Sequence, residues 1–298
     1  MLFFLILATF FRTMNITVIG ETNIDIRTKA ISQLNGNGCT PSVITFHFGG
    51  VARNIATNLS KMGHDVRLMT LFGNDDYASQ LKQDCEKRGI KLDLSDTKDG
   101  YHSPIFLSLT DEIGNVKTAF SDMEINNLMG KEWIESKMSE INRDDIVVAD
   151  TLLDEEALAF LIDHCDVPVF IDTVSPNKAV RLAQALKKSC CGIFALKCNQ
   201  QEAFALTSIA NPKTSAIALN RLGIEHVYVT LGADGAIYSD GADAFHAPAL
   251  SANVVNVMGS GDAFLAGIID AFSKGKKGEA ALPYGLAASK TIIESSDD

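Results

Sequence analysis

Apolar positions along the chain follow two patterns, one typical of strands and one typical of helices. Short apolar runs typical of buried strands, such as ITVI at 16–19 and VVAD at 147–150, alternate with segments that carry apolar residues at helical spacing. One of these segments, 51–63, places four apolar side chains on one helix face: Val51, Ile55, Leu59 and Met62. Because strands that alternate with helices pack as a mostly parallel sheet with helices on both faces, the pattern predicts an α/β fold.

Two stretches break this rhythm with a period of two. Residues 40–48 place three apolar side chains on one side of a strand: Ile44, Phe46 and Phe48. Residues 103–121 are typical of a hairpin around the turn DEIGN. One-sided strands inserted into a parallel domain predict a small separate sheet, within about 23–48 and 101–122. We expect it to form a lid over the carboxyl ends of the main strands, where ligands bind in such folds.

Composition narrows the class of protein. The chain has 298 residues, a net charge of −11 and six cysteines without zinc-binding spacing. An acidic surface repels polyphosphates and anionic lipids, which argues against nucleic acid or a membrane as a partner. The scattered cysteines favour reduced thiols in a cytoplasmic protein over a metal centre. Residues 1–13 are apolar but too short to span a bilayer, and we interpret them as a leader or a mis-started extension.

The sequence GSGD at 259–262 opens a strongly apolar helix. Amides at a helix N-terminus are unpaired and lie in the positive field of the helix dipole, and glycines let a phosphate approach them closely. Asp262 beside them could take a proton from an attacking hydroxyl. The alternative is that Asp262 caps the helix and the glycines form a turn. A dinucleotide fingerprint is excluded, because Phe264 stands where its third glycine is required.

Candidate acceptor residues lie near the first strand and before the next helix. Gly49 and Gly50 permit close backbone contact with a ligand, and Asn54 can both donate to and accept from hydroxyls. Asn23 and Asp25 follow the first strand, and a carboxylate there can accept from two vicinal hydroxyls. Each of these residues is alternatively an ordinary turn or cap residue.

Two further motifs contain groups suited to phosphates and cations. Asn199 and Glu202 lie one helical turn apart and could orient Mg²⁺ through water, although the same spacing is typical of a capping box. Thr230 ends a strand, and Gly232 and Gly235 after it could approach a nucleotide or form a simple glycine hairpin.

In their order and spacing these motifs resemble the PfkB, or ribokinase-like, family of sugar and nucleoside kinases. Gly-Gly with Asn54 resembles the first family signature, and VMGSGDAFLAG at 257–267 resembles the second, with Ser260 where alanine is usual. The Asn-x-x-Glu and Thr-x-Gly-x-x-Gly elements follow the family order. The resemblance implies a three-layer α/β/α sandwich with a β-sheet lid, formed by residues 14–298 as a single kinase domain.

The resemblance also implies a chemistry, the transfer of the γ-phosphate of ATP, with Mg²⁺, to a hydroxyl. Asp262 would be the base, and the amides of Gly259, Ser260 and Gly261 would form an anion hole. The residues implied to hold the acceptor are Asn23, Asp25, Gly49, Gly50, Asn54 and, near the nucleobase, Asp122. Those implied for ATP are Asn199, Thr230, Gly232 and Gly235, and those for Mg²⁺ are Asn199 and Glu202. Stretches such as GGVARNIATNL and LKCNQQEA resemble the members that phosphorylate the 5′-hydroxyl of free pseudouridine.

Some features depart from the family pattern. Asn256 and Met258 stand where many members carry an aspartate and a threonine linked with a monovalent-cation site, which weakens the expectation of activation by K⁺. The sequence stops at ESSDD, where relatives usually run on, so we expect an imperfect gene model or a truncated product with weaker ATP binding.

The residues leave alternatives open for the acceptor and for the activity. The chain could be another kinase of this family, acting on ribose, a hexose or adenosine, or a catalytically weak nucleoside-binding protein of the same fold. Because relatives pair through the lid, the resemblance also implies a homodimer formed by that sheet.

Overall fold

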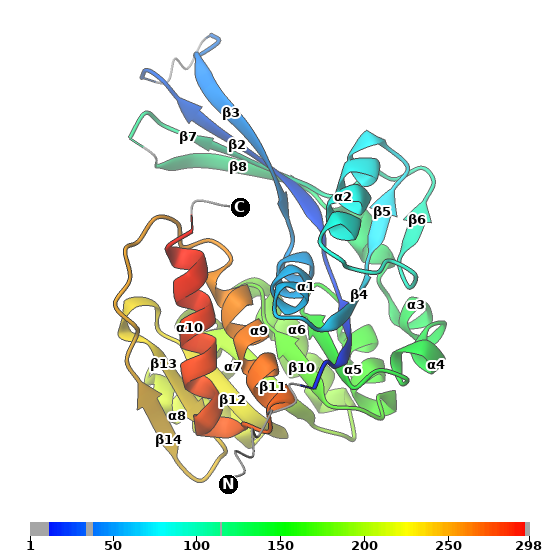
Figure 1. Cartoon of the computed structure of the whole chain (residues 1–298), viewed down its shortest axis with the longest axis vertical. Helices are drawn as coiled ribbons and strands as arrows, with labels where there is room; N and C mark the ends of the chain where they lie inside the picture. The colour runs from blue at the N-terminus through cyan, green and yellow to red at the C-terminus, as the bar shows by residue number, and fades with distance from the viewer. Residues whose placement is uncertain (1–11, 34–37, 114, 296–298) are drawn as a thin grey trace, which may run out of the picture.

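The computed structural model describes residues 12–33, 38–113 and 115–295 (Figure 1). Within these ranges eight strands form one large sheet. In sheet order they are β14 (Ala244–Ala247), β13 (Ala236–Ser239), β12 (Ile224–Thr230), β11 (Ile193–Asn199), β10 (Val169–Asp172), β9 (Ile146–Asp150), β1 (Asn15–Ile19) and β4 (Asp65–Met69). The strands from β12 to β4 pair in parallel, and at one edge β13 pairs antiparallel with both β12 and β14. The predicted leader lies outside the described residues, apart from 12 and 13.

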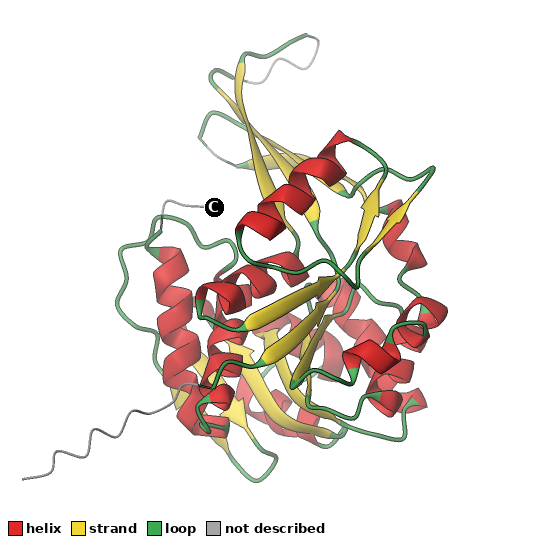
Figure 2. Cartoon of the chain, turned by 45° about the vertical axis from the view of Figure 1, so that its right-hand side comes forward, coloured by secondary structure: helices red, strands yellow, loops and turns green. Residues whose placement is uncertain are grey.

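Helices cover both faces of this sheet, which gives the predicted three-layer sandwich (Figure 2). The helices of the described ranges are α1 (Val51–Lys61), α2 (Asp76–Lys87), α3 (Lys131–Glu135), α4 (Met138–Ile141), α5 (Glu155–His164), α6 (Pro176–Lys188), α7 (Gln200–Thr207), α8 (Pro212–Asn220), α9 (Ser260–Ser273) and α10 (Leu282–Ile293), and the short 3₁₀ turns are η1 (Glu124–Leu128), η2 (Gly232–Asp234) and η3 (Gly278–Ala281). All of these helices except α2 belong to the sandwich. None of the helices in the described ranges has the length and apolar composition that a bilayer crossing requires.

Two apolar cores hold the layers together. On one face of the sheet, side chains of α1, α9 and α10, such as Ile55, Phe264 and Leu286, pack against the strands. On the other face, α3, α5 and α6 contribute Trp133, Leu158 and Leu182. Helix α9 lies between α1, α10 and the sheet and is buried continuously over residues 262–271. This burial on all sides explains why its sequence is apolar all round.

The second sheet is the lid that the period-two stretches predicted. Its order is β3 (Ser42–Gly49), β2 (Asn23–Ala30), β7 (Ile105–Thr110) and β8 (Val116–Asp122). Figure 1 shows this sheet projecting from the top of the sandwich. A two-stranded sheet, β5 (Leu71–Gly73) with β6 (Asp96–Lys98), lies near its base with α2.

The strand register gives the two lid faces different chemistry. Residues directly opposite one another in neighbouring strands share a face. One cross-strand row is apolar and consists of Phe46, Ile26, Leu107 and Phe120. The next row, on the opposite face, consists of His47, Asp25, Phe106 and Ser121. The lid therefore has one largely apolar face and one face with polar residues beside the strand ends of the sandwich.

Candidate active site

Helix α9 begins in the geometry that an anion hole requires. The chain enters it through Gly259, whose left-handed backbone (φ 74°) is unfavourable for residues with a Cβ. Among the described residues, no acceptor is found for the amides of Gly259, Gly261 and Asp262, whereas the Ser260 amide donates to the Val257 carbonyl at 3.3 Å. Three donors thus remain available at the positive end of the helix dipole.

Asp262 is held by α1 and does not cap its own helix. Its Oδ2 accepts a hydrogen bond from Nδ2 of Asn54 at 2.9 Å, and the residue is 8% exposed. Burial raises the pKa of Asp262 to about 7, and the nearby Asp172 carboxylate adds to this effect while Lys197 opposes it. A carboxyl group with a pKa near the working pH is well suited to accept a proton.

A buried cation that the sequence analysis missed lies beside the anion hole. Nζ of Lys197, at the end of β11, donates to Oδ2 of Asp172 at 3.0 Å. A Cβ on Gly261 would come within 2.7 Å of this ammonium group. Burial lowers the pKa of Lys197, but the carboxylates of Asp172, Asp262 and Glu202 outweigh it and raise the pKa above its usual value. The available signal was a single charged residue at the end of each apolar strand, FALK and VFID.

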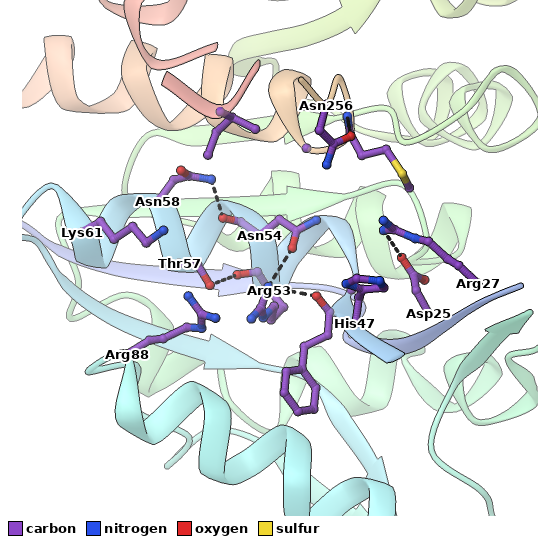
Figure 3. Close-up of a pocket in the computed structure, with 15 residues that line it drawn as sticks. Asp25, Arg27, His47, Arg53, Asn54, Thr57, Asn58, Lys61, Arg88 and Asn256 are labelled. Atoms are coloured by element: carbon purple, nitrogen blue, oxygen red, sulfur yellow. Dashed lines mark hydrogen bonds and ion pairs between the residues drawn. The ribbon is translucent and has the colours of Figure 1, made fainter. Parts of the chain in front are cut away.

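The start of α9 stands between two cavities. The first, here called the α1 cavity, has a volume of about 110 Å³ and is lined by Asp25, Gly49, Asn54 and Gly259 among others (Figure 3). The second, the α9–α10 cavity, measures about 520 Å³. Its lining includes Thr230, Gly232, Gly235, Ser260 and Gly261. The predicted acceptor and nucleotide residues thus fall largely into separate cavities that meet at one helix N-terminus.

The Gly-Gly pair serves the close approach of the chain to itself. A Cβ on Gly49 would lie 2.8 Å from Oδ1 of Asn23 and 2.9 Å from Oδ1 of Asp25. Gly50 has a φ of 100°, and a Cβ there would lie 2.3 Å from the Glu21 carbonyl oxygen. The pair therefore lets β3 turn into α1 against β2. Nδ2 of Asn23 donates to Oδ1 of Asp25 at 2.6 Å, so Asn23 orients the Asp25 carboxylate.

The Asn199–Glu202 motif forms the capping box that was the alternative interpretation. Oδ1 of Asn199 accepts from the Glu202 amide at 2.9 Å, and Oε2 of Glu202 accepts from the Asn199 amide at 2.7 Å. The hydroxyl of Thr173 also donates to Oε2 of Glu202, at 2.6 Å. The described residues contain no group of three or more side chains placed to hold a metal. The side-chain oxygens of Asn199 and Glu202 fit a Mg²⁺ ion that is bound through water and phosphate oxygens. They do not fit a site in which protein side chains supply all the metal ligands.

Asp122 is placed differently from the other predicted acceptor residues. It lies opposite Ile105 at the end of β8, whereas the row of Asp25 contains Phe106 and Ser121. Neighbouring residues of a strand point to opposite faces, so the register favours Ser121 over Asp122 as the β8 residue on the Asp25 side. The role of Asp122 stays a prediction.

Two buried carboxyl groups at neighbouring strand ends were also missed. The Glu21 amide donates to Oδ2 of Asp150 at 3.0 Å, and Oε1 of Glu21 accepts from Nδ2 of Asn126 at 2.9 Å. Burial raises the pKa of Glu21 to about 7 and that of Asp150 to about 8. Acidic residues directly after apolar strands were the signal in the sequence. They make the strand ends an acidic, low-dielectric region in which Lys197 is a buried cation.

Comparisons with known proteins agree with this geometry. The pfkB family of carbohydrate kinases matches residues 13–298. Pseudouridine kinase of Escherichia coli (strain K12) is 34% identical over 268 residues, which cover 87% of this chain and 84% of that protein. Guanosine-inosine kinase of Exiguobacterium acetylicum is 25% identical, with 95% of each chain covered. The structure of Arabidopsis thaliana ribokinase complexed with ribose and ATP has a TM-score of 0.81 at 19% identity, covering 96% of this chain and 94% of that one.

The family match spans almost all of the chain, and the resemblance inferred from the motifs is confirmed. The ribokinase-like fold, with its mostly parallel sheet and smaller second sheet, is confirmed as well. The relatives phosphorylate different acceptors, so the similarity establishes the class of reaction more firmly than the substrate. The chain belongs to the pfkB family of carbohydrate kinases.

Proposed function

We propose that this kinase transfers the γ-phosphoryl group of ATP to the 5′-hydroxyl of pseudouridine. The observation that carries the proposal is the N-terminus of α9, where Gly259 lines one cavity, Gly261 lines the other, and Asp262 is hydrogen-bonded to Asn54. A group transferred between ligands in these two cavities would pass the amides of this turn. The pseudouridine kinase of Escherichia coli, at 34% identity, supports the choice of acceptor.

Asp262 would act on the acceptor hydroxyl. As the 5′-oxygen attacks the γ-phosphorus, the new O–P bond forms, the bond to the ADP oxygen breaks, and the hydroxyl proton passes to the Asp262 carboxylate. Asn54 keeps one carboxylate oxygen oriented through its 2.9 Å hydrogen bond. General-base assistance of this kind typically contributes about 10²–10⁴ in rate.

The charge that develops on the phosphoryl group would be stabilised by groups already in place. The free amides at the start of α9 and the Lys197 ammonium next to Gly261 are held by the fold, so little reorganisation is needed during the transfer. Phosphoryl transfer depends mainly on such positioning and charge stabilisation. When bound, Mg²⁺ would supply further charge neutralisation at the phosphates, with Asn199 and Glu202 orienting it through water.

We assign no role to K⁺. Asn256 and Met258 replace the aspartate and threonine that the family pattern links to a monovalent-cation site. Oδ1 of Asn256 accepts from the Met258 amide at 3.0 Å, which uses one of its acceptor sites within the loop.

The test is a coupled ADP-release assay of the purified protein with pseudouridine, uridine, guanosine, adenosine, ribose and fructose. We expect pseudouridine to give the highest kcat/KM. Stimulation by ribose or fructose alone would refute the acceptor while leaving the kinase class intact. Nucleoside binding in calorimetry without ADP release from any acceptor would favour the weak nucleoside-binding alternative.

We also infer that two copies pair through the lid. The edge residues of its apolar row, Phe46 and Phe120, are 62% and 61% exposed, and Ile44 on the same face of β3 is 56% exposed. A large apolar side chain at both edges of a small sheet is costly to leave in water, and a second copy would cover this face. Sedimentation velocity of the wild-type protein measures the oligomeric state directly.

A further inference from the structure

The α1 cavity has a more positive wall than a site for a neutral nucleoside requires. Its cationic lining residues are Arg27, Arg53, Lys61 and Arg88, and the only carboxylate among its described lining residues is that of Asp25. The chain as a whole carries a net charge of −11, so this is a local reversal of sign. Cavities lined by one sign of charge concentrate ligands of the opposite sign.

The ion pairs around the cavity leave part of this charge uncompensated. Arg27 is paired with Asp25 at 3.2 Å. Arg53 and Arg88 share a single carboxylate, Asp84, at 2.5 and 3.0 Å. Lys61 has no hydrogen-bond or ion-pair partner within the part of the chain that the structure describes. Among the described residues, one guanidinium charge and one ammonium charge therefore remain in excess.

This excess lies at the end of the cavity away from Asp25. Asn54, Asn58 and Lys61 recur on one face of α1, and the separation of seven positions between Asn54 and Lys61 corresponds to about 10 Å along the helix. Figure 3 shows Asn58, Lys61 and Arg88 together on one side of the cavity, opposite Asp25, with Arg53 and Asn54 between them. The positive end is thus separate from the predicted acceptor residues, although both belong to one continuous cavity.

Size and chemistry together point to a small oxyanion. The cavity volume of about 110 Å³ exceeds the space of several waters, so its positive end can hold a small ion beside the acceptor residues. Arginine and lysine side chains with a neighbouring asparagine amide are common phosphate ligands. We propose that Lys61, Arg88 and Asn58 form a binding site for a phosphate dianion, either the free ion or the phosphate of a nucleoside monophosphate.

The test measures binding and does not depend on turnover, so its outcome is independent of the proposed function. The full-length protein is titrated by calorimetry with sodium phosphate and, separately, with uridine 5′-monophosphate, in sodium chloride at constant ionic strength. Lys61→Gln removes one unpaired charge from the cavity, and Arg88→Gln is the second variant. Lys87→Gln is the matched control, because Lys87 is the last residue of α2, directly precedes Arg88 and does not line the cavity.

We expect saturable binding of one phosphate group per chain. Loss of a charge-assisted contact should weaken it about tenfold or more in Lys61→Gln, whereas Lys87→Gln should change it by less than about twofold. Binding of inorganic phosphate with this pattern identifies the free ion, and binding of the nucleotide alone identifies the phosphate of a larger ligand. Absence of saturable binding to either probe, or an equal effect of Lys61→Gln and Lys87→Gln, overturns the proposal.

Discussion

The substitution Asp262→Asn removes the proposed base and keeps its shape. The asparagine oxygen can still accept the hydrogen bond that Nδ2 of Asn54 now donates to Asp262. The Lys197 ammonium keeps its 3.0 Å contact with Asp172. The variant therefore tests the carboxylate charge with little change in packing, and nucleoside binding should be retained.

The loss of activity follows from the chemistry of the step. Without a group to receive the acceptor proton, kcat should fall by about 10²–10⁴. In the wild type, the base acts only when deprotonated, so kcat/KM should rise with pH until it levels off above the Asp262 pKa of about 7. The residual rate of the variant should lack this dependence, because its side chain does not titrate.

The same substitution should make the protein more stable at alkaline pH. Burial raises the Asp262 pKa from 3.8 to about 7, so the folded state binds more protons than the unfolded state between these values. Stability contributed by this residue is therefore present at acidic pH and is lost as pH rises to about 7. A difference of about three between the folded and unfolded pKa of Asp262 corresponds to at most about 4 kcal/mol of unfolding free energy. Because Lys197 loses a neighbouring anion in the variant, we expect a net gain in stability of about 1–3 kcal/mol at pH 8.

Urea unfolding at pH 5 and pH 8, the ADP-release assay and nucleoside calorimetry together measure these effects. Asp270→Asn on the same helix is the control, because the hydrogen bonds and charges of His64 and Lys274 outweigh burial and lower the Asp270 pKa. That variant should stay active and lose stability at pH 8. Unchanged turnover in Asp262→Asn, or equal loss of nucleoside binding and rate, would contradict the role as base. A variant less stable than the wild type at pH 8 would contradict the reasoning from burial.

Three further substitutions test other parts of the site. In Gly261→Ala, the new Cβ would lie 2.7 Å from Nζ of Lys197, so kcat should fall at least about tenfold, whereas the control Gly130→Ala, with no atom closer than 3.8 Å, should be fully active in the same assay. Glu202→Gln keeps one oxygen for the capping box, but its new amide group would face the Nδ2 donor of Asn199, so its urea unfolding free energy should fall by about 1–3 kcal/mol; the Mg²⁺ concentration for half-maximal activity should also rise if Glu202 orients the ion. Phe46→Ser with Phe120→Ser should shift sedimentation to the monomer and leave the melting temperature nearly unchanged, since both side chains are exposed; an unaltered dimer would contradict pairing through the apolar row.

Local features of the fold and site could be predicted from the sequence. The alternation of apolar strand-like runs with helical segments predicted the parallel sheet. The glycines before Asp262 predicted the free amides of α9, because the structure of a helix end depends on residues that are neighbours in sequence. The sequence could not distinguish between two roles of the Asn199–Glu202 motif, because a capping box and a water-mediated magnesium site need the same residues at the same spacing.

Contacts between distant segments could not be predicted in this way. Asn54 and Asp262 are 208 positions apart, and Lys197 and Asp172 are 25 apart on different strands. No periodicity links such residues, so the burial that raises the Asp262 pKa and the neighbours that modify it appeared only in three dimensions. The sequence also did not show that the Gly49–Gly50 pair packs against the side chains of Asn23 and Asp25 and the backbone of Glu21; its contact with ligand stays a prediction.

Electrostatics explains why this site should need a divalent cation to bind ATP. The buried carboxyl groups of Asp172, Asp262 and Glu202 surround one buried ammonium, that of Lys197. Triphosphate brings further negative charge into the same low-dielectric region, where unpaired charges are costly. The α9 amides supply only partial positive charges. A cation bound with the phosphates would restore the balance, so nucleotide affinity should depend on Mg²⁺ more steeply than nucleoside affinity does. Calorimetry of both ligands with and without Mg²⁺ measures this difference, and equal dependence of the two affinities would contradict the charge argument.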